Sequence, residues 1–290
     1  MKQDTVPLRA KIIILIAVTL WASAFAGIRA GLEGYTPGAL ALLRFLVASV
    51  CIAILHARVS KKIPIAFRDK ILLLLTGMLG LGIYSLALNY GEIQISSGVA
   101  SFIISLSPLV TLIIAALFLN ETVTGTMVVG TLVSIFGVGL IMASKEHAIH
   151  SRLGFFYLFI SMVISGLYSI IQKPFLKKYH ALDVTSYIIW GATLLLLVYT
   201  PEMINNIRTA SMHATFAVIY LGIFPATAGF MAWSYALKEM PASRAVNYLY
   251  FMPIIATLTG WIWLGETPAF LSLLGGLIAL LGVWIVSQRR

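Results

Sequence analysis

Long apolar runs alternate with short polar stretches along the whole chain of 290 residues. A helix needs about 20 mostly apolar residues to cross the roughly 30 Å hydrocarbon core of a bilayer. Runs of this length are found at 11–30, 37–57, 70–90, 96–119, 125–143, 153–172, 182–200, 214–236, 242–264 and 270–287. The first run lacks an A-x-A-like cleavage site, so we expect a retained helix and not a signal peptide. The pattern predicts ten membrane-spanning helices and leaves no room for a soluble domain.

Composition agrees with lipid as the main solvent of this chain. Hydrophobic residues make up 60% and charged residues 10%, with a mean hydropathy of +0.98, whereas a soluble domain carries about 25% charged residues. The single cysteine, Cys51, allows no intrachain disulfide. The net charge of +10 comes from short basic clusters between apolar runs, which is typical of membrane proteins and argues against nucleic acid as a partner.

The basic clusters also predict an orientation. With a cytoplasmic N-terminus, fifteen of the 20 Lys and Arg residues fall in cytoplasmic segments, four fall on the opposite side, and Arg44 lies inside a span. Cytoplasmic loops carry an excess of Lys and Arg. We therefore expect both termini in the cytoplasm and a multi-pass protein of the cell membrane, the inner membrane of a bacterium.

The chain repeats itself at a distance of 145 residues. Residues 87–143 align without a gap on 232–288, and eleven of the 57 pairs are identical, including Pro108 with Pro253 and Glu121 with Glu266. Five helices per half is an odd number, so the second half must cross the membrane in the opposite sense. The prediction is an all-α integral membrane protein of ten transmembrane helices, built as two inverted five-helix repeats, 1–146 and 147–290. Secondary transporters use such halves for alternating access to a central site.

Several stretches also follow a familiar order. LWASAFAGIRAGL is followed by ALALLRF, then by ALNYGEIQISSGVASFIISLSP, and the two halves end their fourth helices with LNET and LGET. In this order they resemble the EamA family of the drug/metabolite transporter superfamily. The resemblance implies a ten-helix carrier of small metabolites, and amino-acid exporters are well represented among the bacterial members of that family.

Polar side chains at helical spacing mark the faces expected to line a cavity, because a polar group in lipid needs a partner or water. Pro108 frees the carbonyl near Ile104, so a break is expected there. The candidate substrate-binding residues are Trp21, Ser23, Tyr84, Asn89, Ser101, Ser105, Tyr168, Gln172, Trp233, Asn247, Tyr248 and Tyr250. For the small hydroxyls the alternative is a role in helix packing. Packing is also the role expected for the glycine faces of 125–143 and 270–287.

The positions of the charged residues limit the transport mechanisms that the sequence allows. All ten acidic residues fall at helix ends or in loops, so no carboxylate is expected at mid-membrane and proton coupling stays open. Glu121 and Glu266 are expected to form ion pairs or to cap the next helix. Arg44 has three possible roles: it could bind a substrate carboxylate, extend to the membrane surface, or pair with Glu33.

These features favour a secondary transporter, an exporter that moves a small polar or zwitterionic metabolite such as an amino acid by alternating access. The alternative within the superfamily is a nucleotide-sugar or phosphate-ester exchanger, which would need several buried cations. A remote alternative is an intramembrane enzyme, but H-E-x-x-H and Walker motifs are absent from the sequence. We expect no catalytic residues, metal or cofactor. The expected partners are the substrate and the bilayer, with the protein a monomer or homodimer.

Overall fold

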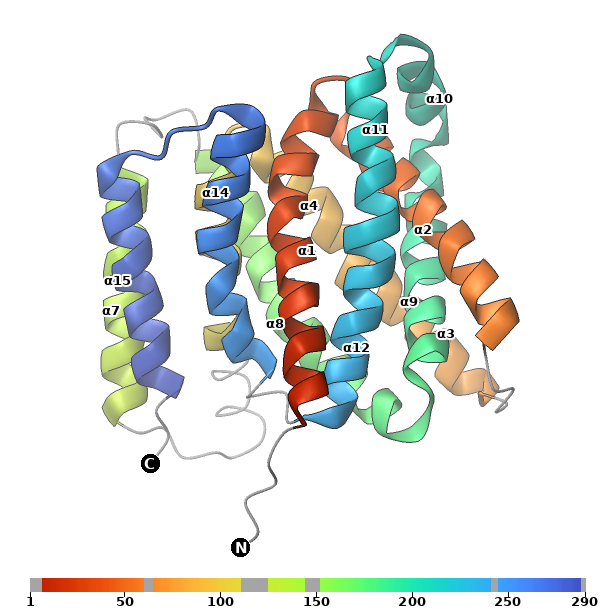
Figure 1. Ribbon diagram of the computed structural model, residues 1–290, viewed down its shortest axis with the longest axis horizontal. Coiled ribbons are helices and arrows are strands. Elements are labelled where there is room, and N and C mark those ends of the chain that lie inside the picture. Colours follow the sequence, from red (N-terminus) through yellow and green to blue (C-terminus); the bar gives the residue numbers. More distant parts are fainter. Residues whose placement is uncertain (1–6, 60–64, 111–124, 144–151, 241–244, 288–290) are drawn as a thin grey trace, which may run out of the picture.

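The computed structural model describes residues 7–59, 65–110, 125–143, 152–240 and 245–287, and every regular element in these ranges is helical. The elements are α1 (Leu8–Leu32), α2 (Pro37–Val59), α3 (Phe67–Gly77), η1 (Met78–Ile83), α4 (Tyr84–Glu92), α5 (Ser97–Ile104), α7 (Gly125–Ala143), α8 (Arg152–Lys178), α9 (Ala181–Leu196), η3 (Leu197–Tyr199), α10 (Thr200–Thr209), α11 (Met212–Leu221), η4 (Gly222–Gly229), α12 (Phe230–Glu239), η5 (Val246–Phe251), α14 (Met252–Leu264) and α15 (Phe270–Ser287). Figure 1 shows them as one bundle of nearly upright helices.

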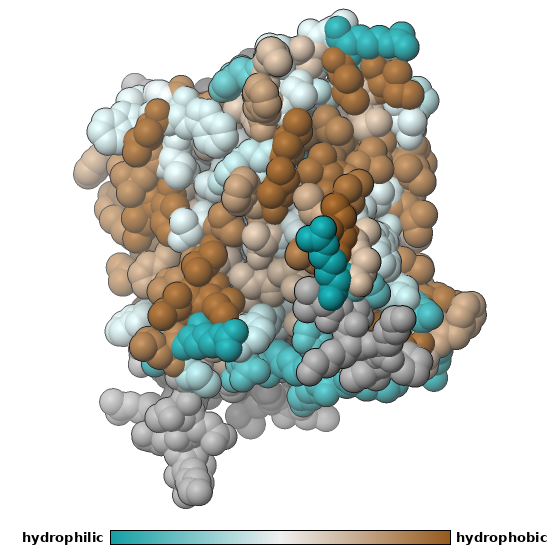
Figure 2. Space-filling model, turned by 45° about the vertical axis from the view of Figure 1, so that its right-hand side comes forward, coloured by the Kyte–Doolittle hydropathy of each residue, from teal (hydrophilic) through white to brown (hydrophobic). Residues whose placement is uncertain are grey.

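Six helical runs within the described ranges are long and apolar enough to cross a membrane. They are α1, α2, α3–η1–α4, α8, α9–η3–α10 and α11–η4–α12, and shorter apolar helices lie at 97–110, 128–137, 248–264 and 270–282. Large apolar side chains are exposed on the outside of the bundle, for example Ile262 at 79% and Phe216 at 63%. Figure 2 shows such side chains over much of one flank. An exposed apolar flank of this extent fits lipid and not water.

The core of the bundle forms where α1 and α8 pack against other helices. α1 packs on α11, η4 and α12 on one side and on α14 on the other, while α8 packs on α4 and α5. α2 lies against α9, and α3 lies against α9 as well. α7 and α15 form a closely packed pair at one edge of the bundle (Figure 1).

Glycines allow the close approach of α7 and α15. A Cβ atom on Gly137 would collide with the backbone of Ala279 and Gly275, and one on Gly282 would collide with the backbone of Gly130. Small residues let membrane helices approach until backbones touch. The contacts agree with the packing role expected for these two glycine faces.

Helix breaks occur close to both repeat prolines. α5 ends at Ile104, four residues before Pro108, as the sequence predicted. On the other side, η5 gives way to α14 at Met252, so that Pro253 occupies the first turn, where its missing N–H leaves no hydrogen bond unmade. The hydroxyl of Ser105 donates to the carbonyl of Leu249 at 3.2 Å, so the two broken segments touch.

Two long helices contain π-helical turns, η1 between α3 and α4 and η4 between α11 and α12. Such turns often occur at functional sites in membrane and soluble helices. In η1, Gly80 lies against the ring of Tyr168. In η4, the carbonyl of Pro225 accepts a hydrogen bond from the Trp21 indole at 3.1 Å. Both irregular turns therefore receive an aromatic side chain, η1 from α8 and η4 from α1.

The start of α1 and the end of α15 lie at the same end of the bundle (Figure 1). This placement is what two chain ends on one side of a membrane require.

Candidate functional site

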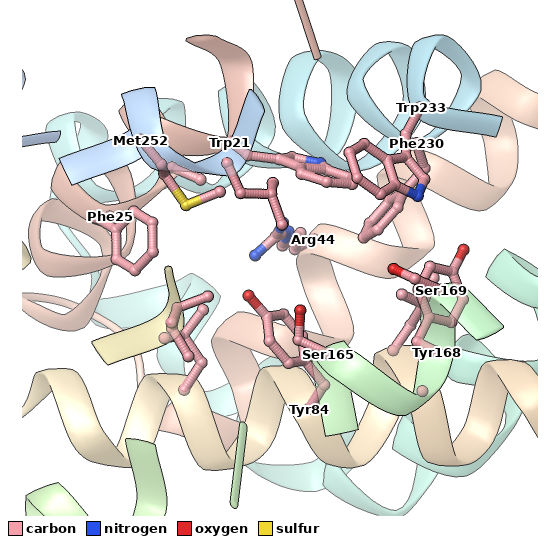
Figure 3. Close-up of a pocket in the computed structure, with 16 residues that line it drawn as sticks. Trp21, Phe25, Arg44, Tyr84, Ser165, Tyr168, Ser169, Phe230, Trp233 and Met252 are labelled. Carbon is pink, nitrogen blue, oxygen red and sulfur yellow. The ribbon is translucent and has the colours of Figure 1, made fainter. Parts of the chain in front are cut away.

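A cavity lies inside the bundle, between α1, α2, α4, α8 and α12. Its lining residues are Trp21, Ala24, Phe25, Arg44, Gly80, Leu81, Tyr84, Leu88, Ile104, Ser165, Tyr168, Ser169, Phe230, Trp233, Leu249 and Met252. Its volume is about 50 Å³, which is room for a few water molecules in this conformation. Figure 3 shows the lining side chains converging from opposite sides of the space.

Aromatic rings form one wall of the cavity. The ring of Trp21 lies 5.1 Å from that of Phe230 and 5.0 Å from that of Trp233, and Tyr168 meets Phe230 edge-on at 6.2 Å. These separations are typical of favourable aromatic pairs. The Trp21 indole is also fixed by its hydrogen bond to Pro225. The wall is therefore a rigid surface against which an apolar or aromatic group can pack.

Arg44 supplies the positive charge of the cavity. Its side chain is 2% exposed, and its Nε and Nη1 have no hydrogen-bond partner among the described residues. Figure 3 shows the guanidinium in the middle of the cavity, between Trp21 and Tyr84. Burying a charge without a partner is costly. An anionic group beside this guanidinium would lower that cost.

The placement of Arg44 decides between the roles that the sequence left open. A buried guanidinium does not extend to the membrane surface, so that role is wrong. Pairing with Glu33 is also not observed, because the Glu33 carboxylate lies 3.8 Å from the imidazole of His213. These observations count against two of the three roles, and the third, binding of a carboxylate, stays a prediction.

Four of the predicted residues line the cavity: Trp21, Tyr84, Tyr168 and Trp233. The hydroxyl of Tyr168 and the indole nitrogen of Trp233 are buried and have no hydrogen-bond partner in the described part of the chain. Buried polar groups normally have a partner. These two are therefore free to bond to a ligand.

Three predicted serines lie outside the lining and bond to protein groups. Ser23 contacts the hydroxyl of Tyr220 at 2.6 Å, on the side of α11. Ser101 donates to a carbonyl of its own helix, and Ser105 links α5 to η5. For Ser101 and Ser105 the packing alternative describes the observed contacts.

Four of the remaining predicted residues are also outside the lining. Asn89 donates from Nδ2 to the carbonyl of Pro37 at 2.9 Å. Gln172 is fully buried, and its amide has no partner within the described ranges. Tyr248 and Tyr250 are partly buried and pack against the core, and neither belongs to the lining. The side chain of Asn247 lies outside the described residues.

Sequence reasoning missed the apolar part of the lining. Phe230 and Met252 carry no polar signal, and an apolar residue in a membrane helix is common everywhere. Ser165 and Ser169 lie on the polar face of α8 that also presents Tyr168, a face that helical spacing marks in the sequence.

A polar clasp closes the end of the bundle opposite the start of α1. Arg29 pairs with Glu266 at 3.1 Å and donates from Nη1 to the carbonyl of Glu92 at 2.6 Å. The second carboxylate oxygen of Glu266 accepts from the backbone N–H and hydroxyl of Ser97, at 3.0 and 2.5 Å. Glu266 thus caps α5, where the helix dipole favours a carboxylate. The expected ion pair of Glu266 is therefore confirmed, with Arg29 as its partner, whereas the helix that Glu266 caps is α5 and not the next one, α15. Glu121 lies outside the described residues.

A second basic contact lies at the other end. Lys173 of α8 donates to the carbonyls of Leu237 and Met240, at the C-terminal end of α12, the latter at 2.7 Å. In the same way, Arg29 of α1 donates hydrogen bonds to the carbonyls of Glu92 and Ile93 at the C-terminal end of α4. The two contacts tie α8 to α12 and α1 to α4.

The structure therefore defines a multi-pass helical membrane protein with an enclosed aromatic and basic cavity. No group of three or more His, Cys, Asp or Glu able to hold a metal occurs in the ranges described. The profile of the EamA-like transporter family matches the chain twice, over residues 8–143 and 152–288. The chain belongs to this family, and it is a transporter and not an enzyme.

Relatives extend over nearly the whole chain. A protein of Streptantibioticus cattleyicolor named "Probable terminal-alkyne amino-acid exporter" is 35% identical over 95% of this chain and 92% of its own length. The "Uncharacterized transporter YdfC" of Bacillus subtilis is 35% identical, covering 92% and 87%. The "Probable amino-acid metabolite efflux pump" of Escherichia coli is 23% identical, covering 94% and 93%.

A solved structure, named only "Crystal structure of protein", shares the fold. It matches with a TM-score of 0.65 at 19% identity, covering 95% of both chains.

Proposed function

We propose that this protein is a secondary transporter that exports an amino acid or a similar small zwitterion by alternating access around the central cavity. The observation that carries the proposal is the buried guanidinium of Arg44 beside an aromatic wall, with no hydrogen-bond partner for its Nε and Nη1 among the described residues. A guanidinium binds a carboxylate through two parallel hydrogen bonds. The wall of Trp21, Phe230 and Trp233 offers a surface for the substrate side chain. Relatives named as amino-acid exporters support the same class of substrate.

A phosphate ester or nucleotide sugar fits this cavity less well. The charge of a phosphate group requires several cations when it is buried. Among the residues that line the cavity, Arg44 alone is charged. One guanidinium matches one carboxylate.

The proposed architecture is ten transmembrane helices in two inverted halves, 1–146 and 147–290. Its support comes from contacts that occur in pairs. Packing of α1 on α12 is matched by that of α8 on α4, packing of α1 on α14 by that of α8 on α5, and packing of α2 on η4 by that of α9 on η1. A two-fold axis in the membrane plane would produce these pairs. The two matches to the family profile divide the chain in the same way.

The proposed orientation places both termini in the cytoplasm of a bacterial cell, with the protein in the inner membrane. The bias of fifteen against four basic residues supports it. The clasp of Arg29 and Glu266 then closes the external side and the contact of Lys173 lies on the cytoplasmic side. The oligomeric state proposed is a monomer or homodimer.

Trp21, Tyr84, Tyr168 and Trp233 are the proposed substrate contacts in the conformation seen here. The other predicted residues, such as Gln172 and Asn89, remain candidates for contacts in other conformations of the transport cycle. Alternating access changes which helix faces meet the cavity.

Exchange across liposome membranes tests the proposal. Liposomes that contain the purified protein are loaded with proteinogenic L-amino acids. The exchange of these internal amino acids for labelled external ones is then measured. For the preferred amino acid, we expect the corresponding amide to compete about thirtyfold less well or worse, because the loss of a buried charged partner costs about 2 kcal/mol or more.

Arg44→Gln should remove this discrimination between acid and amide. Arg58→Gln, at the exposed end of the same helix, is the matched control and should retain it. If the variant at position 44 discriminates as the wild type does, the carboxylate role of Arg44 is excluded.

A further inference from the structure

Glu92 is a buried acid at the end of α4. Its side chain is fully buried, and neither carboxylate oxygen has a hydrogen-bond partner among the residues that the structure describes. The sequence placed this residue at a helix end, where a carboxylate normally meets water. Here the helix end is covered by α1 and by the turn that carries Glu266. A buried ionised carboxylate without hydrogen bonds is costly, whereas its protonated form is much less so.

Three charges act on Glu92 from the helices around it: Arg29 on α1, Arg44 on α2, and Glu266 after α14. The guanidinium of Arg29 is already engaged by the Glu266 carboxylate and by the main-chain oxygen of Glu92. α5 and α8 also pack on α4, and they present the serine at 97, the side chain of Leu158 and the backbone of Gly154 near this end. With Glu92 ionised, the two arginines and the two glutamates carry equal and opposite charge. Protonation of Glu92 therefore leaves this group with a net positive charge.

Glu92 lies next to the cavity along one face of α4. Tyr84, Leu88 and Glu92 are spaced by four residues, so their side chains point to the same side of the helix. Tyr84 and Leu88 line the cavity. Glu92 is thus one turn beyond it, toward the clasp. On the far side of the clasp, Arg29 and Glu266 line polar hollows that open to solvent.

We propose that Glu92 binds the proton that this transporter exchanges for its substrate, an inference that rests on the proposed function. With the substrate carboxylate on Arg44, its ammonium group is attracted by ionised Glu92. Protonation of Glu92 removes that attraction, so proton and substrate exclude each other. A proton from the outside adds to Glu92 as the substrate leaves outward, and the same proton passes to the cytoplasm as the next substrate binds.

Accumulation driven by a pH gradient tests this role. Liposomes that contain the purified protein receive an equimolar mixture of proteinogenic L-amino acids. A gradient of about one pH unit sustains about tenfold accumulation at one proton per substrate, because equal concentration ratios carry equal free energy. In Glu92→Gln the ratio should fall to about one in the same assay. Exchange without a gradient should persist at raised substrate concentration, because Arg44 is intact.

Glu33→Gln is the matched control, since Glu33 is an exposed acid at the same end of the bundle. It should accumulate substrate as the wild type does. Proton movement in the wild type, followed with a pH-sensitive dye inside the liposomes, gives a second readout that does not depend on the folding of any variant.

The outcomes separate the two proposals. No exchange of any amino acid by the wild type overturns the proposed function. Net transport of substrate without proton movement, or gradient-driven accumulation by Glu92→Gln, overturns the role of Glu92 and leaves the proposed function standing.

Discussion

Single side chains in this bundle divide into those bonded to protein and those left free for a ligand. Tyr220 and Tyr84 illustrate the difference. The hydroxyl of Tyr220 contacts Ser23 at 2.6 Å. The hydroxyl of Tyr84 points into the cavity toward the Arg44 guanidinium (Figure 3). Both are half-buried tyrosines in long apolar helices, and only the three-dimensional arrangement separates them.

Removal of each hydroxyl should therefore have a different effect. Tyr84→Phe should raise the half-saturating substrate concentration about tenfold, because a hydrogen bond to a charged group is worth about 1.5 kcal/mol or more. Tyr220→Phe should leave it unchanged. The measurement is exchange in liposomes over a range of substrate concentrations. Equal effects of the two substitutions would contradict the assignment of Tyr84 to the site.

The residue scale also shows where sequence reasoning ended. Bulky polar and aromatic residues at helical spacing led to Trp21, Tyr84, Tyr168 and Trp233, because such side chains are unusual in lipid. The same rule selected Asn89, which instead bonds to the carbonyl of Pro37. The sequence alone does not show which inward-facing helix surface lines a cavity and which packs against another helix. That depends on contacts between residues far apart in the chain.

At the scale of elements, the pair of α7 and α15 is a scaffold held by glycine contacts. Gly137 faces the backbone of α15, whereas a Cβ atom added at Gly139, two residues on, would have no neighbouring atom within 4 Å among the described residues. Gly137→Ala should lower the stability of the folded protein by about 1–3 kcal/mol through overpacking. Gly139→Ala should be neutral or slightly stabilising.

Thermal unfolding in detergent, followed by the fraction that remains monodisperse, measures this difference. The two alanines add the same group to the same helix, so helix propensity cancels in the comparison. Equal midpoints for Gly137→Ala and Gly139→Ala would contradict the close approach of these helices.

The irregular elements could be predicted only in part. Pro108 and Pro253 predict the helix breaks after α5 and before α14. A proline lacks the backbone N–H that a continuing helix needs for its hydrogen bond. The π-helical turn η1 contains no proline, and nothing in its residues Met78–Ile83 marks the change. Its cause lies in packing, since Gly80 receives the ring of Tyr168 from α8.

At the scale of the whole molecule, one basic contact lies at each end of the bundle, that of Arg29 and that of Lys173. The contact of Arg29 with Glu266 has side chains 34% and 19% exposed, so solvent weakens it. Glu266→Gln removes the ion pair. If the ion pair stabilises the closed conformation by about 1 kcal/mol, its removal should raise the population of molecules that are open at this end about fivefold.

The rate at which a water-soluble thiol reagent modifies a cysteine introduced at Ser165, in the cavity lining, reports that population. Glu202→Gln, an exposed acid of α10 at the same end, is the control and should not alter the rate. An unchanged rate in Glu266→Gln would show that the clasp does not hold this end closed.

Burial of Glu92 and Arg44 is also a property of the whole molecule. The sequence showed that Arg44 lies in a span and that Glu92 ends one, but the environment of each depends on how α1, α2 and α4 pack. Sequence patterns were therefore enough to predict an all-helical membrane protein and its family. The burial of the charges that the proposed mechanism uses follows only from how the helices pack.

The central claim is that one cavity opens in turn to each side of the membrane. The most direct measurement is modification of a cysteine at Ser165, in a protein whose native Cys51 is replaced by serine, by a membrane-impermeant reagent applied to either side of sealed vesicles. The account predicts modification from both sides, and protection from both sides by the transported amino acid. Modification from one side only, unaffected by substrate, would contradict it.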